Sequence, residues 1–144
     1  AQVGIGTTTP GSYKLYVVGS GYATVSFVDG SDIRWKKDIK PISNVIPNLM
    51  KLQGVHYHWK VEEYADKGFD TTLQIGFIAQ EVEKYFPELV KTNTDGFKGI
   101  SYDKISAILV EGMKEQQNQI EAQKNEIELL KAKLDALEKS LTNK

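Results

Sequence analysis

The sequence predicts an α+β protein in which a short β-rich segment and a small mixed body precede a long C-terminal helix. Residues 1–30 contain short β-type runs separated by glycine and proline turns. Residues 31–101 mix strand-like and helix-like apolar patterns. Residues 102–144 are rich in Glu, Lys, Gln, Leu and Ala, and their apolar residues recur every seven positions. Three parts are therefore expected, at 1–30, 31–101 and 102–144.

The first part carries two expected strands, at residues 14–18 and 23–27. Strands this short are not stable alone in water, so we expect them to pair with chain outside the segment. The chain opens on Ala1 rather than methionine, and we expect a longer protein upstream. The opening AQVGIG lacks the basic and apolar blocks of a signal peptide.

The middle part opens with an expected short helix and strand. Ser43 is the predicted N-cap of the helix, Pro47 weakens its first turn, and Gly54 ends it. Residues 55–60 alternate as a strand, which places Val55, Tyr57 and Trp59 on one face.

A second helix and a hairpin complete the middle part. Residues 78–86 carry an amphipathic pattern that stops before Pro87. Residues 89–92 and 97–100 flank the turn Thr94-Asp95-Gly96, which is typical of a β-hairpin.

The last part has the pattern of a coiled coil. Two series recur every seven residues and are offset by three: Ser106, Met113, Ile120, Ile127, Leu134 and Leu141, then Leu109, Gln116, Gln123, Leu130 and Leu137. Such a narrow apolar seam needs partner helices. Isoleucine at a with leucine at d favours a dimer, but glutamine at two d positions leaves dimer and trimer both open. An adaptor that binds a partner's helix through residues 113–141 is a further alternative.

Composition excludes several classes of function. A net charge of −1 over 144 residues shows no excess of basic residues of the kind that binds the phosphates of nucleic acid. The absence of cysteine excludes disulfides and thiolate metal sites. No apolar run reaches the roughly 18 residues of a membrane span, so no membrane insertion is expected. Val3-Gly4-Ile5-Gly6 is followed by threonines and a proline rather than a helix, so no nucleotide loop is indicated and no cofactor is expected.

Two histidines lie on one face of the expected strand, at His56 and His58. They have the chemistry of metal ligands, but no third ligand is signalled, so exposed or hydrogen-bonded histidines are favoured. The larger aromatic residues are most simply core: Trp35, Tyr57, Trp59, Phe77, Tyr85 and Phe86.

The stretch SDIRWKKDIKPI, residues 31–42, holds the strongest candidate for chemistry. A serine hydroxyl becomes a nucleophile when a base takes its proton, and Lys36 is a candidate base for Ser31. Lysine serves as a base only when burial or a nearby cation lowers its pKa. Arg34 and Lys37 offer such cations, and Trp35 offers an apolar surface that could exclude water. Gly30 leaves its carbonyl sterically open. By itself the pattern is common in surface loops.

Four ordered blocks resemble the intramolecular chaperone domain of endosialidase-type phage tail spikes, tail fibres and related bacterial surface proteins. They are SDIRWKKDIKPI (31–42), LQGVHYHWK (52–60), GFIAQEVEKYFPELV (76–90) and ISYDK (100–104). The resemblance covers residues 31–141. VGIGTTTP (3–10) resembles a β-rich fibre-stalk repeat that commonly precedes this domain.

The resemblance implies a homotrimer with a three-stranded coiled coil, which aligns an upstream fibre passenger in cis and then cuts itself free. It implies a single-turnover serine endopeptidase with Ser31 as nucleophile and Lys36 as base, cleaving between Gly30 and Ser31. Asp32 and Arg34 match the motif as supporting residues. Gln80 and Glu81 match a marked block, with no chemical step assigned and with capping or interchain hydrogen bonds as the simpler role.

The same resemblance implies a place in a phage virion tail fibre or on a bacterial surface. The alternative function is a trimerisation or anchoring module of a fibre or surface protein that does not cleave.

Overall fold

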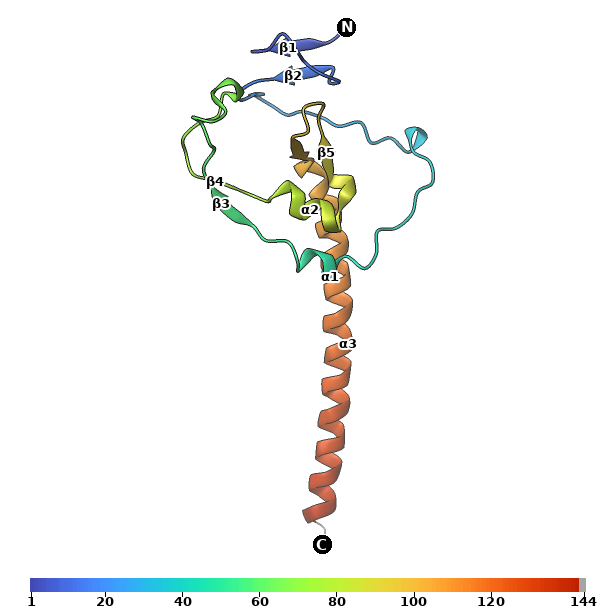
Figure 1. The fold of residues 1–144 in the computed structure, drawn as a ribbon. Helices are drawn as coiled ribbons and strands as arrows, with labels where there is room; N and C mark the ends of the chain where they lie inside the picture. Colours follow the sequence, from blue (N-terminus) through green and yellow to red (C-terminus); the bar gives the residue numbers. More distant parts are fainter. Residues whose placement is uncertain (143–144) are drawn as a thin grey trace. The chain divides into compact units, whose positions relative to one another are not determined.

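The computed structural model describes residues 1–142 and has a mixed α+β fold, as predicted (Figure 1). Three two-stranded sheets and short helices are followed by one long helix. The chain divides into two compact units. Residues 1–41 and 51–102 form the first, and residues 42–50 with the rest of the long helix form the second.

The N-terminal segment contains one parallel strand pair, β1 (Val3–Ile5) and β2 (Leu15–Val17). Strand β2 confirms the strand expected at 14–18. The expectation that it must pair outside its own segment is wrong, because β1 supplies the partner, joined by a loop in which Gly6 and Gly11 adopt left-handed backbone conformations. The strand expected at 23–27 is also wrong. That stretch has no ladder partner, and Val25 is 91% exposed.

The second sheet pairs β3 (Val55–Tyr57) with β4 (Gln74–Gly76) in antiparallel register. Strand β3 confirms the predicted strand but ends three residues early. The polar excursion between β3 and β4 folds back so that Trp59 stacks on Phe69, with ring centroids 4.2 Å apart. Tyr57 meets the edge of Trp59, which closes a small aromatic cluster.

The core of the first unit forms around α2 (Ala79–Tyr85) and the hairpin β5 (Val90–Thr92) and β6 (Lys98–Ile100). Both elements confirm the predictions. Val82, Phe86 and Leu89 are buried here, and Lys98 ties the hairpin to α2 through a 2.7 Å ion pair with Glu83.

The second unit joins α1 (Ile46–Leu49) to α3 (Tyr102–Thr142). The predicted Ser43 N-cap is wrong. The N-cap position is Val45, two residues later, and its side chain makes no capping bond. The carboxylate of Glu115 on α3 accepts the N–H groups of Val45 and Ile46 instead.

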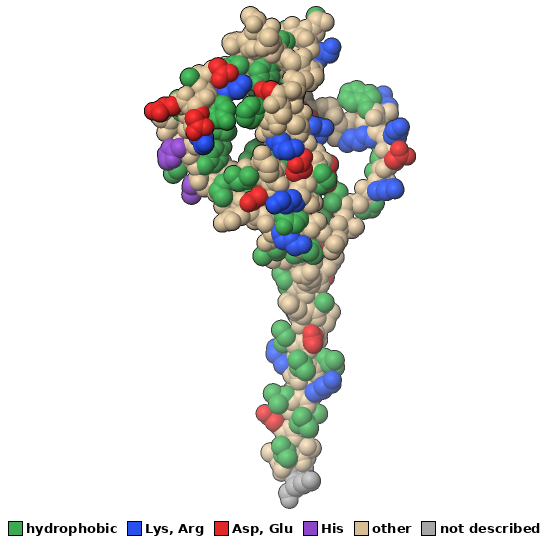
Figure 2. Space-filling model, viewed as in Figure 1, with side chains coloured by type: hydrophobic (Ala, Val, Ile, Leu, Met, Phe, Trp, Pro, Cys, Tyr) green, Lys and Arg blue, Asp and Glu red, His purple; other side chains and the backbone are tan. Residues whose placement is uncertain are grey.

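Helix α3 confirms the predicted long helix and runs through Gly112 without a break. Of the expected range 102–144, residues 143–144 lie outside the part described. The seam residues stay largely exposed in the single chain: Ile120 is 50% exposed and Leu137 is 61% exposed. Figure 2 shows hydrophobic side chains along the length of this helix. Within residues 1–142, no helix is both long enough and apolar enough to span a membrane.

Candidate functional site

The candidate site is a tight turn at the start of the segment SDIRWKKDIKPI. Asp32 caps the 3-10 helix Ile33–Trp35 by accepting the backbone N–H of Arg34 at 2.9 Å. The Arg34 guanidinium returns to the same carboxylate with two further hydrogen bonds, of 3.0 and 2.8 Å. This guanidinium holds the pKa of Asp32 below its usual 3.8. The two supporting residues therefore bond to each other and shape the turn.

The turn brings together the two residues predicted to act chemically. Lys36 Nζ donates a hydrogen bond to Ser31 Oγ at 2.6 Å. The Lys36 backbone N–H bonds to the Ile33 carbonyl at 3.0 Å, so the lysine is set by the last turn of the 3-10 helix. The two atoms are thus within the distance over which a proton could pass between a serine and a lysine, with the lysine as the donor in this structure.

Trp35 lies against Gly30 rather than in a core. A Cβ atom built on Gly30 would stand 2.6 Å from Cζ3 of the Trp35 ring, so a side chain there would require the indole to shift. The prediction that Trp35 belongs to the core is wrong, since its side chain is 74% exposed. Ser31 and Lys36 are exposed as well. In the single chain one aromatic face covers the Gly30 side of the turn, and water reaches the rest.

The other sequence candidates do not join this turn. His56 lies in β3 opposite Ile75, and His58 follows the strand. Among residues 1–142, no three His, Cys, Asp or Glu side chains come together as metal ligands would. Gln80 and Glu81 lie in α2, where neither side chain makes a hydrogen bond within the described chain.

One contact explains two of the sequence blocks and was missed by sequence reasoning. The Tyr102 hydroxyl accepts the Phe77 backbone N–H at 3.0 Å. A Cβ atom on Gly76 would approach that hydroxyl to 2.6 Å, so Gly76 makes room for the tyrosine. The glycine before Phe77 and the tyrosine of ISYDK are thus one structural unit. Their residue types alone carried no sign of the pairing.

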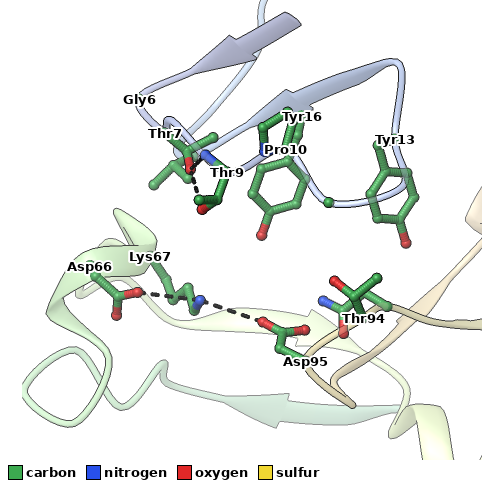
Figure 3. Close-up of a pocket in the computed structure, with 13 residues that line it drawn as sticks. Gly6, Thr7, Thr9, Pro10, Tyr13, Tyr16, Asp66, Lys67, Thr94 and Asp95 are labelled. Atoms are coloured by element: carbon green, nitrogen blue, oxygen red, sulfur yellow. Dashed lines mark hydrogen bonds and ion pairs between the residues drawn. The ribbon is translucent and has the colours of Figure 1, made fainter. Parts of the chain in front are cut away.

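A polar cleft lies within the first unit, between the N-terminal strand pair and the part of residues 51–102 that carries Lys67 and Asp95 (Figure 3). It has a volume of about 140 Å³, and its walls come from the β1–β2 loop, from Asp66 and Lys67, and from the β5–β6 turn. Lys67 lies between Asp66 and Asp95, at 3.3 and 3.8 Å. The Asp66 carboxylate raises the pKa of Lys67, so the cleft keeps a cation facing Thr7 of the β1–β2 loop and Tyr16 of β2.

An α+β body that opens on a Ser–Lys turn and leads into a helix with an uncovered apolar seam agrees with the resemblance to intramolecular chaperone domains. Such a domain is a part of a chain that assists the folding of the same chain. Residues 31–91, less than half of the chain, match the family model described as chaperone of endosialidase. The match begins at Ser31.

Relatives of this chain include two phage proteins. It is 36% identical over 89 residues to the long tail fiber protein Gp37 of Enterobacteria phage K3. It is 37% identical over 87 residues to the protein of the same name from Salmonella phage S16. The alignments cover 58% and 54% of this chain but only 7% and 11% of those relatives.

Proposed function

We propose that this chain is the assembly chaperone of a phage tail fibre, which trimerises, aids folding of the fibre passenger, and then cleaves its own Gly30–Ser31 bond. The 2.6 Å hydrogen bond between Lys36 Nζ and Ser31 Oγ carries the proposal. Its position adds support, because the family match starts at the same serine. The names of the relatives point to the tail of a phage virion as the location.

The proposed reaction is an N→O acyl shift followed by hydrolysis. Neutral Lys36 accepts the hydroxyl proton of Ser31 as Oγ attacks the carbonyl carbon of Gly30. The adduct collapses by breaking the C–N bond, and the proton on Lys36 passes to the departing nitrogen of Ser31. Water then hydrolyses the ester between Gly30 and Ser31 Oγ, which leaves a carboxylate on Gly30 and restores the hydroxyl.

Assembly is the proposed trigger for this reaction. A lysine exposed to water keeps its proton and donates to the serine, whereas a base must accept from it. Burial disfavours the charged ammonium. In this proposal, neighbouring copies cover the exposed turn in the trimer, so Lys36 becomes a base only after assembly, and cleavage waits for a folded fibre.

The trimer is proposed to form through α3. Its apolar seam residues are between 48% and 72% exposed in the single chain, which is the state of a coiled-coil helix without its partners. Three aligned helices raise the local concentration of three passenger ends, so their pairing becomes nearly intramolecular. This offsets part of the entropy cost of bringing short strands into register.

Residues 1–30 are proposed to be the end of the passenger, residues 31–101 the chaperone domain, and residues 102–144 the coiled-coil helix. The cleft around Lys67 supports contact between passenger and chaperone in cis. The lining of this contact combines polar side chains such as Lys67 and Asp95 with Pro10, Tyr16 and Val18. No hydrogen bond joins residues 1–30 to residues 51–102 in the described chain. Such a contact suits a passenger that is guided and then released.

A second candidate is a trimerisation or anchoring module that does not cleave. The exposure of both Ser31 and Lys36 in the single chain favours it, because a lysine needs burial to act as a base and this lysine is exposed there.

The intact mass of freshly expressed protein separates the two candidates. Self-cleavage predicts fragments 1–30 and 31–144 from the parent chain, and only the full-length mass from Ser31→Ala. Lys36→Arg keeps the charge but removes the base, because arginine stays protonated, so it is expected to remain intact. Lys37→Arg is the matched control and is expected to cleave normally. Normal cleavage of Lys36→Arg would refute the dyad, and a parent chain that stays whole after prolonged incubation would favour the anchoring module.

A further inference from the structure

The strap formed by residues 42–50 is fastened to α3 by a single carboxylate. The backbone N–H of Val45 donates to both oxygens of Glu115 at 3.0 Å, and the N–H of Ile46 donates to one of them at 3.1 Å. These bonds satisfy the open start of α1, which no residue of the strap caps. They also hold the pKa of Glu115 below its usual 4.5, so the carboxylate is charged at neutral pH.

A notch in α3 receives the strap beside this carboxylate. Gly112 is buried, and a Cβ atom added there would stand 2.8 Å from Cδ1 of Leu49 and 3.6 Å from Cγ1 of Val45. Val45 itself is only 1% exposed. Asn44 turns the chain into the notch with a left-handed φ of 58°, a conformation that asparagine tolerates better than most residues. Glycine is thus kept inside a helix, where it costs helix stability, because a side chain would displace the strap.

The strap and the seam use different faces of α3. Buried Ile108 and Gly112 and the strap's carboxylate Glu115 follow at i, i+4 and i+7, which is one stripe of a helix. The seam series Leu109, Met113 and Gln116 lies roughly a third of a turn away. The strap can therefore remain bound while other copies of the chain occupy the seam.

The strap is also the continuation of the turn that carries the Ser–Lys pair. Asn44 follows Lys36 by eight residues, which span at most roughly 28 Å even when extended. Fixing residues 44–46 on α3 limits where Ser31 and Lys36 can go relative to the helix that assembles.

We propose that Glu115 is a positioning residue for self-cleavage, which with the Gly112 notch tethers the dyad segment to the trimer-forming helix. The inference rests on the proposed function, since it assumes that assembly of α3 and cleavage at Gly30–Ser31 are coupled. Glu115 acts through the strap backbone and touches none of the reacting atoms.

The test has two arms that fail separately. The first measures hydrogen–deuterium exchange of a peptide covering residues 42–50 in full-length trimers that carry Ser31→Ala, so that it reports the tether without any cleavage. Glu115→Gln is expected to speed exchange roughly tenfold or more, because the negative charge is lost and one of the two accepting oxygens becomes an NH2 donor that faces the strap N–H groups. Glu121→Gln, a carboxylate on the same helix bonded only to Gln117, is the matched control and is expected to leave exchange unchanged.

The second arm measures the rate of cleavage in chains that keep Ser31. Glu115→Gln is expected to slow cleavage about tenfold while sedimentation still reports trimers. Gly112→Leu fills the notch with a better helix former, so it is expected to slow cleavage without weakening α3. Fast exchange with unchanged cleavage in both variants would overturn the positioning role. Unchanged exchange would overturn the tether itself. A parent chain that never cleaves would overturn the proposed function, and the exchange arm would still decide the tether.

Discussion

At the scale of single residues, the geometry around the Gly30–Ser31 bond depends on four side chains that lie within six residues of one another. Asp32 and Arg34 close the turn, and the turn delivers Lys36 to Ser31. Each contact is local in sequence, so a short motif is enough to encode it. The pairing of Ser31 with Lys36 was predicted from the resemblance of this motif to the chaperone family. The role of Asp32 and Arg34 as each other's partners was not, because many pairings are open to two charged residues.

Gly30 offers a sharp test at this scale, because Gly30→Ala would drive a methyl group into the Trp35 ring. Its backbone is not in the left-handed region, so the effect of alanine is steric rather than conformational. Displacing the ring or the peptide by about 1 Å is expected to slow cleavage roughly 10- to 100-fold. The cleavage rate is read from intact mass, and tryptophan emission reports the shift of the indole.

The control for that substitution is Gly21→Ala in the same exposed segment, where an added Cβ meets nothing within 4 Å. It is expected to cleave at the parent rate. The double variant Gly30→Ala with Trp35→Ala removes the clash and is expected to recover part of the rate. Parent-rate cleavage by Gly30→Ala alone would show that the indole contact has no part in the reaction.

At the scale of elements, the sequence predicted the elements that depend on residues close together in the chain. It did not predict those that depend on residues far apart. Helices α2 and α3 and the β5–β6 hairpin were predictable because the apolar periodicity and the turn residues that specify them lie within each element. The start of α1 was not, because its cap is Glu115, some 70 residues further along. The parallel pairing of β1 with β2 likewise depends on partners that a local pattern does not specify.

The seam of α3 is testable as an element. Ile127→Lys places a charge at an a position, and burying one isoleucine there is worth roughly 1.5–3 kcal/mol per chain. We expect this variant to shift from trimer toward monomer in sedimentation at low concentration. Leu129→Lys is the matched control: Leu129 is 56% exposed against 51% for Ile127, but it lies off the seam. If both variants, or neither, dissociated, the heptad assignment would be wrong.

At the scale of the whole molecule, two sites lie on the same chain and are expected to act together. One is the exposed Ser–Lys turn, and the other is a helix that leaves its apolar seam open. A folding aid that cuts itself away too early would abandon its passenger. Under the proposed function, a base that depends on assembly would provide the delay, and a released stalk would then persist through its slow unfolding.

Refolding of the purified precursor tests the central claim most directly. Full-length chain is isolated in denaturant, diluted into buffer over a range of concentrations, and followed by intact mass alongside sedimentation. We predict that the fragment beginning at Ser31 appears only as trimers form, with an initial rate that rises more steeply than in proportion to chain concentration. Cleavage at the same fractional rate in dilute monomers, or trimers that keep the full-length mass, would contradict the account.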